Sequence, residues 1–232
     1  MLRDKKLALF CFSPPVMVAT FLIEIILLLA LVVRYKMNRI TRLIALSLFA
    51  LAFFQLAEYF VCGGLGVDAQ TWSRLGFVAI TTLPPLGLHI IYGIKKTPRM
   101  WPVWGSYALM AVWIGVFAFS QTAFRSHECA GNYVVFNLQY QLSYFYSAYY
   151  YGILLLGIAA ALRFAQQASG RQKQALLGMI AGYLVFLLPT AVVNTINPAT
   201  MAGIPSIMCG FAVVFALILF FYITPRVAKP KK

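Results

Sequence analysis

Residues 15–33 read PVMVATFLIEIILLLALVV, and this stretch decides the fold class. It is apolar from end to end apart from Thr20 and Glu24, and it lacks the alternation of apolar and polar residues that a half-buried strand shows. A helix of about 20 apolar residues is long enough to cross the hydrocarbon core of a bilayer. We therefore expect residues 15–33 to form a transmembrane helix.

Six further apolar stretches of similar length follow, so the sequence predicts an all-α polytopic membrane protein, a bundle of seven transmembrane helices. The composition agrees, because 62% of the residues are hydrophobic, 10% are charged and the mean hydropathy is +0.84. The connections are short, so residues 1–232 are expected to form a single transmembrane domain. The predicted spans are residues 15–33, 43–61, 72–94, 103–124, 139–162, 175–195 and 205–223.

Basic residues fall mostly on one side of these spans. Of the 19 Lys and Arg residues, 14 lie in the first, third and fifth connections or in the C-terminal tail. Cytoplasmic loops of membrane proteins carry such an excess, so we expect the N-terminus outside and the C-terminus inside. The residues on the expected inner side are Arg34, Lys36, Arg39, Arg42, Lys95, Lys96, Arg99, Arg163, Arg171, Lys173, Arg226, Lys229, Lys231 and Lys232.

The net charge of +14 also raises the question of a nucleic-acid partner. The basic residues are confined to short loops that flank apolar helices, and no extended basic face exists to follow a phosphate backbone. We expect these side chains to set the topology and to contact anionic headgroups of the lipid bilayer, with no nucleic acid as partner.

Three polar residues in the first two spans are candidates for ligand binding. Glu24 falls near the middle of the first span, and Gln55 and Glu58 lie one turn apart on one face of the second. An ionisable side chain in hydrocarbon is costly, so it normally faces the bundle interior and often marks a functional site. The alternative is that Glu24 makes one buried hydrogen bond that only fixes helix packing.

Two further polar residues, His89 and Asn194, lie near prolines that should kink their helices. Pro84–Pro85 precedes His89 in the third span, and Asn194 lies about one turn beyond Pro189, whose break it is placed to satisfy in part. Both are ligand-binding candidates, with a purely structural hydrogen bond as the alternative.

No metal site or catalytic residue is predicted. A metal needs three or four converging ligands, and we expect Glu24, Glu58 and His89 to lie at three different depths in the membrane. The sequence contains no HExxH, GxSxG or phosphate-binding glycine loop, and it identifies no cofactor.

Tyrosines are concentrated at the start of the fifth span. Tyr140, Tyr144 and Tyr151 recur at helical spacing on one face. An interfacial aromatic belt explains those nearest the outer surface, but it does not require Tyr151, which lies two to three turns deep. Tyr144 and Tyr151 are therefore candidate aromatic walls of an outer-facing pocket bordered by Glu58 and Gln55, with belt and packing roles as the alternative.

Three of the four cysteines map to the expected outer side, where disulfides are permitted. Cys62 ends the second span and Cys129 lies in the longest outer loop, so we expect these two to form a disulfide. A pairing that uses Cys11 is the alternative. Cys209 lies within the seventh span, where a small packing residue is the simplest interpretation.

Several short motifs resemble a known class of membrane region. The sequences WSRL at residues 72–75, LPPLGLH at 83–89 and RQKQ at 171–174 resemble the seven-helix sensor region at the N-terminus of many bacterial histidine kinases and cyclic-dinucleotide enzymes. CFS at residues 11–13, with Gln55 and Glu58, also resembles bacterial seven-helix proteins that open Cys-Phe-Ser. The resemblance implies a bacterial inner (plasma) membrane location, and it carries over no catalytic residues.

The leading functional expectation is a stand-alone membrane sensor that binds a small amphipathic or cationic ligand. No kinase or cyclase domain follows the seventh span, so the signal is expected to pass to a separate cytoplasmic or membrane partner. The runner-up is a small secondary transporter, because Thr-Pro-Arg recurs at residues 97–99 and 224–226 and hints at a three-plus-one-plus-three repeat. The third is an intramembrane enzyme that uses Glu24 or Glu58 as acid or base.

Overall fold

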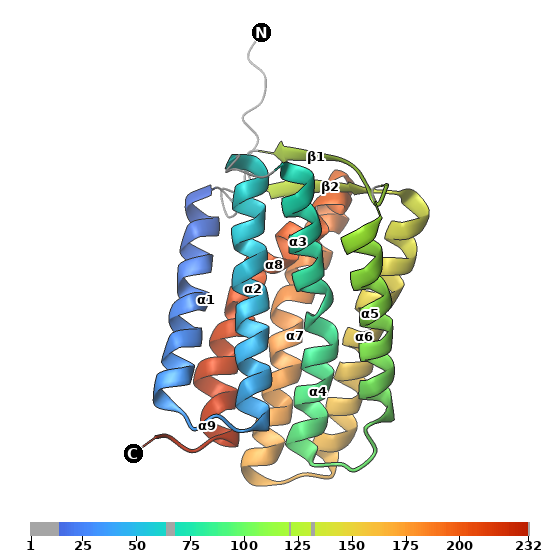
Figure 1. The fold of residues 1–232 in the computed structure, drawn as a ribbon. Helices are drawn as coiled ribbons and strands as arrows, with labels where there is room; N and C mark the ends of the chain where they lie inside the picture. Colours follow the sequence, from blue (N-terminus) through green and yellow to red (C-terminus); the bar gives the residue numbers. More distant parts are fainter. Residues whose placement is uncertain (1–13, 64–67, 121, 131–132, 232) are drawn as a thin grey trace.

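The computed structural model describes residues 14–231 apart from 64–67, 121 and 131–132. Within this part the chain is a bundle of long helices with one two-stranded hairpin across an end (Figure 1). Its elements are α1 (Pro14–Arg34), α2 (Arg39–Gly63), α3 (Ala69–Thr81), α4 (Leu83–Lys95), α5 (Trp101–Phe119), β1 (Phe124–Ala130), β2 (Tyr133–Leu138), α6 (Tyr140–Gln166), α7 (Gly170–Ile196), the 3₁₀ turn η2 (Pro198–Gly203), α8 (Ile204–Leu217), the π-helical segment η3 (Ile218–Ile223) and α9 (Thr224–Val227).

Seven helical segments of the described chain are long and apolar enough to cross a membrane, which confirms the predicted all-α class and the predicted number of long apolar helices. The third is α3 with α4, and the seventh runs from α8 through η3 into α9. The predicted fourth span, residues 103–124, is too long at its C-terminal end. The helix α5 stops at Phe119, and Phe124 already belongs to β1.

The third span is divided at Thr82 by the proline pair that follows it. Pro85 has no amide hydrogen, so the Thr81 carbonyl cannot receive the usual bond from the residue four positions on. The hydroxyl of Tyr149 in α6 donates to this carbonyl at 2.7 Å. The Thr81 hydroxyl also lies 3.0 Å from the hydroxyl of Tyr146. Two of the clustered tyrosines thus stabilise the predicted break.

The antiparallel hairpin β1–β2 was not predicted. It lies across the end of the bundle where α1 begins (Figure 1), which we call the hairpin end. The hairpin packs through aromatic rings, because Phe124 of β1 and Phe136 of β2 lie 5.0 and 5.1 Å from Phe77 of α3 between ring centroids. The predicted disulfide between Cys62 of α2 and Cys129 of β1 is present, with the Cα atoms 5.8 Å apart.

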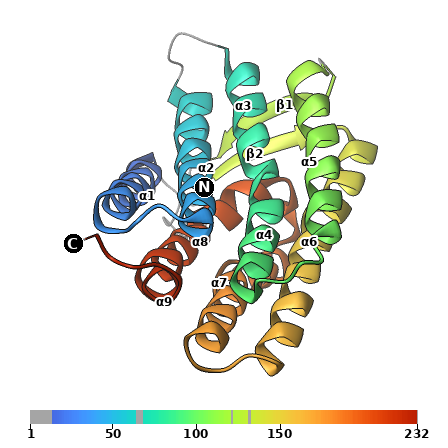
Figure 2. The ribbon, with the colours of Figure 1, turned by 60° about the horizontal axis from the view of Figure 1, so that its bottom comes forward.

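The opposite end, which carries Arg39, Lys96, Arg171 and α9, is called the basic end. There the C-terminal tail pairs with the connection between α1 and α2. Lys36 N donates to Lys229 O at 3.1 Å, and Lys231 N donates to Arg34 O at 2.8 Å. The last helix is thereby joined to the first two, as Figure 2 shows from this side.

Tyr183 of α7 occupies the middle of the bundle, where two glycines make room for it. A side-chain carbon added at Gly87 of α4 would collide with the Tyr183 hydroxyl, and one at Gly157 of α6 would lie 3.1 Å from its ring. Close approach of α4, α6 and α7 therefore depends on the absence of side chains at these two positions.

Candidate functional site

Glu24 and Glu58 are both buried in the interior, where α1 and α2 pack against α8. Their side chains are 0% and 1% exposed, and the two carboxyl groups interact electrostatically. Glu24 lies roughly 15 Å along α1 from the hairpin end. In the described part of the chain, neither Glu24 oxygen has a hydrogen-bond partner, and Glu58 Oε1 has none either. This arrangement is unusual for structural residues, because buried polar atoms are nearly always paired.

Ser206, in the first turn of α8, connects this carboxyl pair to the hairpin. Its hydroxyl interacts with the Glu58 side chain, and its Oγ accepts a hydrogen bond of 3.2 Å from the backbone N–H of Val134 in β2. A serine hydroxyl has one donor and two acceptor sites, so it can hold both contacts at once. Ser206 and Val134 are almost fully buried, at 1% and 0% exposed.

Two more side chains belong to the same polar cluster. Gln55 is 2% exposed, one turn before Glu58 as predicted, and its Nε2 has no partner among the described residues. Cys209 follows Ser206 by about one turn of α8, is buried with a free thiol, and interacts electrostatically with both glutamates. Sequence reasoning missed Ser206 and set Cys209 aside, because nothing in α8 alone distinguishes them from packing residues.

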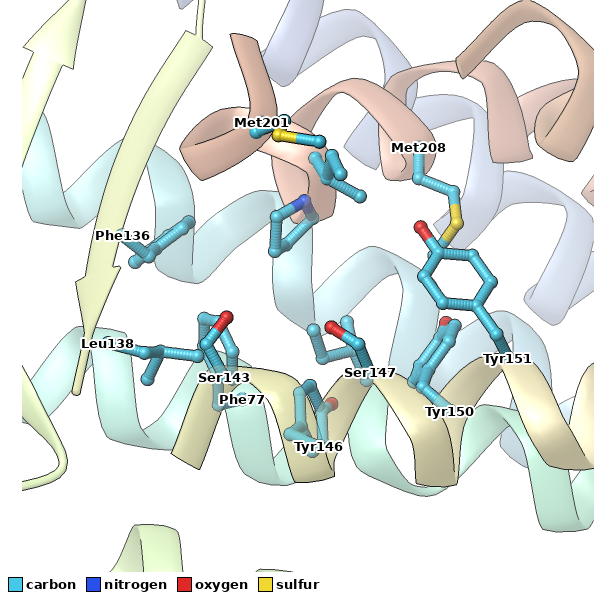
Figure 3. A pocket seen from close by; sticks show the side chains of 13 residues that line it. Phe77, Phe136, Leu138, Ser143, Tyr146, Ser147, Tyr150, Tyr151, Met201 and Met208 are labelled. Carbon is cyan, nitrogen blue, oxygen red and sulfur yellow. The ribbon is translucent and has the colours of Figure 1, made fainter. Parts of the chain in front are cut away.

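A cavity of about 80 Å³ lies between the hairpin, α6 and the start of α8 (Figure 3), and Pro205 in its wall directly precedes Ser206. It reaches the surface beside Met201 of η2, which is 64% exposed. A water molecule needs roughly 10–15 Å³ measured in this way, so the space holds several waters or a small molecule. The lining residues are Phe77, Ile80, Phe136, Leu138, Ser143, Tyr146, Ser147, Tyr150, Tyr151, Met201, Ile204, Pro205 and Met208.

The lining of this cavity is amphipathic and carries no charge. The hydroxyls of Ser143, Ser147 and Tyr151 stand among apolar side chains and the Met201 and Met208 thioethers (Figure 3). Such a surface orients a small polar group while burying an apolar body.

A second, smaller cavity lies beside the first in the interior of the bundle. Its volume is about 20 Å³, which suffices for one water molecule, and Tyr150 and Met208 line both cavities. Cys209 and Tyr183 form part of its wall, and the Tyr183 hydroxyl has no partner in the described structure. Of the polar cluster, only Cys209 lines this smaller cavity, and Tyr150 and Met208 stand between the two cavities.

The predicted outer pocket needs correction in three of its four residues. Tyr151 lines the cavity, but Tyr144 is 70% exposed on the outside of α6. Glu58 and Gln55 do not line it either, because the first turn of α8 lies between them and the cavity.

The other two predicted site residues lie elsewhere. His89 is at the basic end, where it contacts Arg39 and Tyr107. Asn194 is near the hairpin end, where its Oδ1 accepts a bond of 2.6 Å from Thr200 Oγ1. This contact holds η2 against α7. Cys11 falls outside the described residues.

Asp68 lies outside the long apolar helical segments, directly before α3, and its pKa is shifted in the folded protein. The hydroxyl and then the backbone amide of Thr71 hydrogen-bond to its carboxylate and lower its pKa below the ordinary value of 3.8. Asp68 therefore caps α3 as an anion.

Among the described residues, no group of three or more His, Cys, Asp or Glu side chains is placed to hold a metal ion. Comparisons of the chain with protein-family models and with curated proteins find no match.

Proposed function

We propose that the protein is integral to the bacterial inner membrane, with the hairpin end outside and the basic end in the cytoplasm. The excess of Lys and Arg at one end supports this orientation, and so does a disulfide at the other, since disulfides persist outside the reducing cytosol. The exposed side chains of α1 and α5 include Leu22, Ile26, Trp104 and Val112, which suit contact with lipid.

In this setting we infer that the protein is a sensor which binds a small ligand in the cavity under the hairpin. The observation that carries this proposal is the double contact of Ser206, which joins the hairpin over the cavity to the buried carboxyl of Glu58. A ligand that displaces the hairpin or Met208 changes the surroundings of Glu58, and with them the packing of α1, α2 and α8. Buried, incompletely paired groups are suited to such a change because alternative arrangements differ little in free energy.

The chemistry of the lining favours an uncharged amphipathic ligand over a cationic one. A cation would leave water for a space in which no lining side chain carries a negative charge. Glu58 stays out of reach behind Ser206.

We propose that the structural change caused by the ligand is transmitted to a partner at the basic end. The seventh span ends there in α9, and the tail after it is bonded to the connection between α1 and α2. A shift of α8 therefore alters the surface formed by the tail and this connection. We propose that a separate signalling partner recognises this surface.

Phenol and indole serve as probes of the cavity, because each combines an apolar ring with one hydrogen-bonding group. A ligand at one hundred times its Kd stabilises a protein by about 2.7 kcal/mol, so a thermal-shift assay detects binding. We expect at least one of the two probes to raise the Tm of the wild-type protein. Ser147→Trp, which fills the cavity, should abolish the shift, and Tyr144→Trp on the outside of α6 should retain it. Equal shifts in both variants would refute the proposed site.

A secondary transporter is the second candidate, favoured by the buried carboxyl pair. Carboxyl groups inside a bundle are also what proton-coupled transporters use. Flux into proteoliposomes separates the two functions. Protein-dependent accumulation of a bound probe that Glu24→Gln abolishes would support transport and reject the sensor.

A further inference from the structure

A long apolar groove runs along the side of the bundle that faces the viewer in Figure 1, where α3 and α4 lie between α2 and α5. Its volume is about 640 Å³, within the range of ligand-binding sites. It is open to the surroundings, since Leu46 and Phe49 on its α2 side are 53% and 52% exposed. Its lining residues are Leu43, Leu46, Phe49, Ala50, Phe53, Leu75, Val78, Ala79, Thr82, Leu86, His89, Trp104, Tyr107 and Met110.

The groove has the length of an acyl chain in one leaflet. Between Leu43 and Phe53 it follows α2 for roughly 15 Å, about half of the 30 Å hydrocarbon core. It begins near the basic end, where Trp101 and Trp104 of α5 are 76% and 60% exposed. Exposed tryptophans mark the level of the lipid headgroups.

A polar triad lies at this beginning of the groove. His89 Nε2 is 3.1 Å from Arg39 Nη2, and His89 Nδ1 is 3.0 Å from the hydroxyl of Tyr107. A guanidinium can only donate, so Nε2 accepts and Nδ1 carries the proton that is donated to the Tyr107 oxygen. The hydroxyl proton of Tyr107 is then left to donate to another group. Arg39 and Tyr107 thus offer hydrogen-bond donors at the mouth of the groove.

The charge at this mouth is positive and is not neutralised by the described chain. A second hollow of about 520 Å³ adjoins Arg39 and includes Lys96 in its wall. Glu24, Glu58, Asp68 and Glu128, the acidic residues that the structure describes, lie inside the bundle or toward the hairpin end. The ligand complementary to this mouth is an anion.

We propose that the groove between α2 and α5 binds one acyl chain of an anionic phospholipid, whose phosphate is bound by Arg39 and Tyr107 with Lys96 close by. The apolar groove suits the chain, and the donors at its mouth suit phosphate oxygens, which only accept. His89 is a positioning residue, since it orients Arg39 and Tyr107 and leaves their remaining hydrogens for the ligand. The proposal needs the membrane location given above but not the sensor role.

Native mass spectrometry of the full chain in mild detergent tests the headgroup site. The probes are phosphatidylglycerol and phosphatidylcholine with identical acyl chains. We expect the wild type to retain phosphatidylglycerol preferentially. Arg39→Gln should weaken this binding about tenfold and Tyr107→Phe severalfold, since each removes a hydrogen bond to a charged group. Arg163→Gln, an exposed charge at the same end outside the groove, is the matched control and should bind as the wild type does.

A groove-filling variant tests the acyl-chain site. Leu46→Trp leaves the triad intact and should lower the binding of phosphatidylglycerol by occupying the groove. Equal retention of both lipids by the wild type, equal effects of Arg39→Gln and Arg163→Gln, or unchanged binding by Leu46→Trp would each overturn the proposal. Thermal unfolding of every variant checks that each protein compared is folded. The phenol and indole assay tests the cavity under the hairpin, so failure of the lipid proposal is distinguishable from failure of the proposed sensor function.

Discussion

The backbone amide of Val134 in the hairpin donates a 3.2 Å hydrogen bond to Ser206 Oγ, although the two residues are 72 positions apart. Through Ser206 this bond links the hairpin to the Glu58 side chain buried in the helix bundle. The proposed sensor function rests on this link.

Ser206→Ala should lower the free energy of unfolding by about 1–3 kcal/mol, because it leaves the buried Val134 amide without a partner and removes the hydroxyl that interacts with Glu58. Chemical denaturation in detergent measures this change. Ser106→Ala is the matched control. It removes a hydroxyl that bonds only to Val103 O within its own helix, and it should cost much less. Equal losses of unfolding free energy in the two variants would show that the Ser206 hydroxyl contributes no more than one that bonds within its own helix.

Tyr149→Phe should also lower the free energy of unfolding by about 1–3 kcal/mol. It removes the donor of the Thr81 carbonyl, which the prolines of α4 leave without a helical partner. Tyr151→Phe removes a hydroxyl at the cavity for which the structure describes no hydrogen bond, so it should be nearly neutral. A neutral Tyr149→Phe would mean that the α3–α4 break is satisfied in some other way.

Gly87→Ala should destabilise the protein by about 1–3 kcal/mol, because the added methyl group collides with the Tyr183 hydroxyl. Tyr183→Phe alone should be close to neutral, since that hydroxyl has no partner in the described chain. Combining the two should recover part of the loss, which a double-mutant cycle reports as a coupling energy. Gly105→Ala, where an added carbon meets nothing within 4 Å, is the control. Strict additivity would contradict the packing described for Tyr183.

Asp68 gives a pH dependence of known sign. Its pKa is lowered in the folded protein, so its capping contribution is fully present above the ordinary value of 3.8 and is lost as the pH falls through the lowered pKa. The difference in Tm between wild type and Asp68→Ala should therefore be constant near neutral pH and shrink below pH 3.8. Asp68→Asn keeps a capping oxygen and should lie between them. A difference that grows in acid would contradict the capping role.

Hydropathy predicted all seven long apolar helices, because the apolar character of each helix can be recognised from its own residues alone. The hairpin was not predicted because its strands are short and because the residues that it contacts, such as Phe77 and Ser206, are far away in the sequence. Val134 and Phe136 alternate with less buried residues, but six residues of β2 between a loop and a tyrosine-rich helix do not stand out.

The candidate site was predicted in part for the same reason. Charge within an apolar stretch identifies Glu24 and Glu58, whereas Ser206 acquires its role only from the contact between α8 and the hairpin. Helical spacing placed Tyr144 and Tyr151 on one face, but spacing along one helix does not show which neighbours cover each turn. In the structure Tyr144 faces outward while Tyr151 lines the cavity.

An experimental density map of the full chain, purified from its native membrane and resolved to the level of side chains, tests the central claim most directly. We predict non-protein density in the cavity between Ser147, Tyr151 and Met208, with Ser206 bonded to both Val134 and Glu58. A cavity filled by Tyr151 itself, with no added density and with Ser206 bonded to neither residue, would contradict the account.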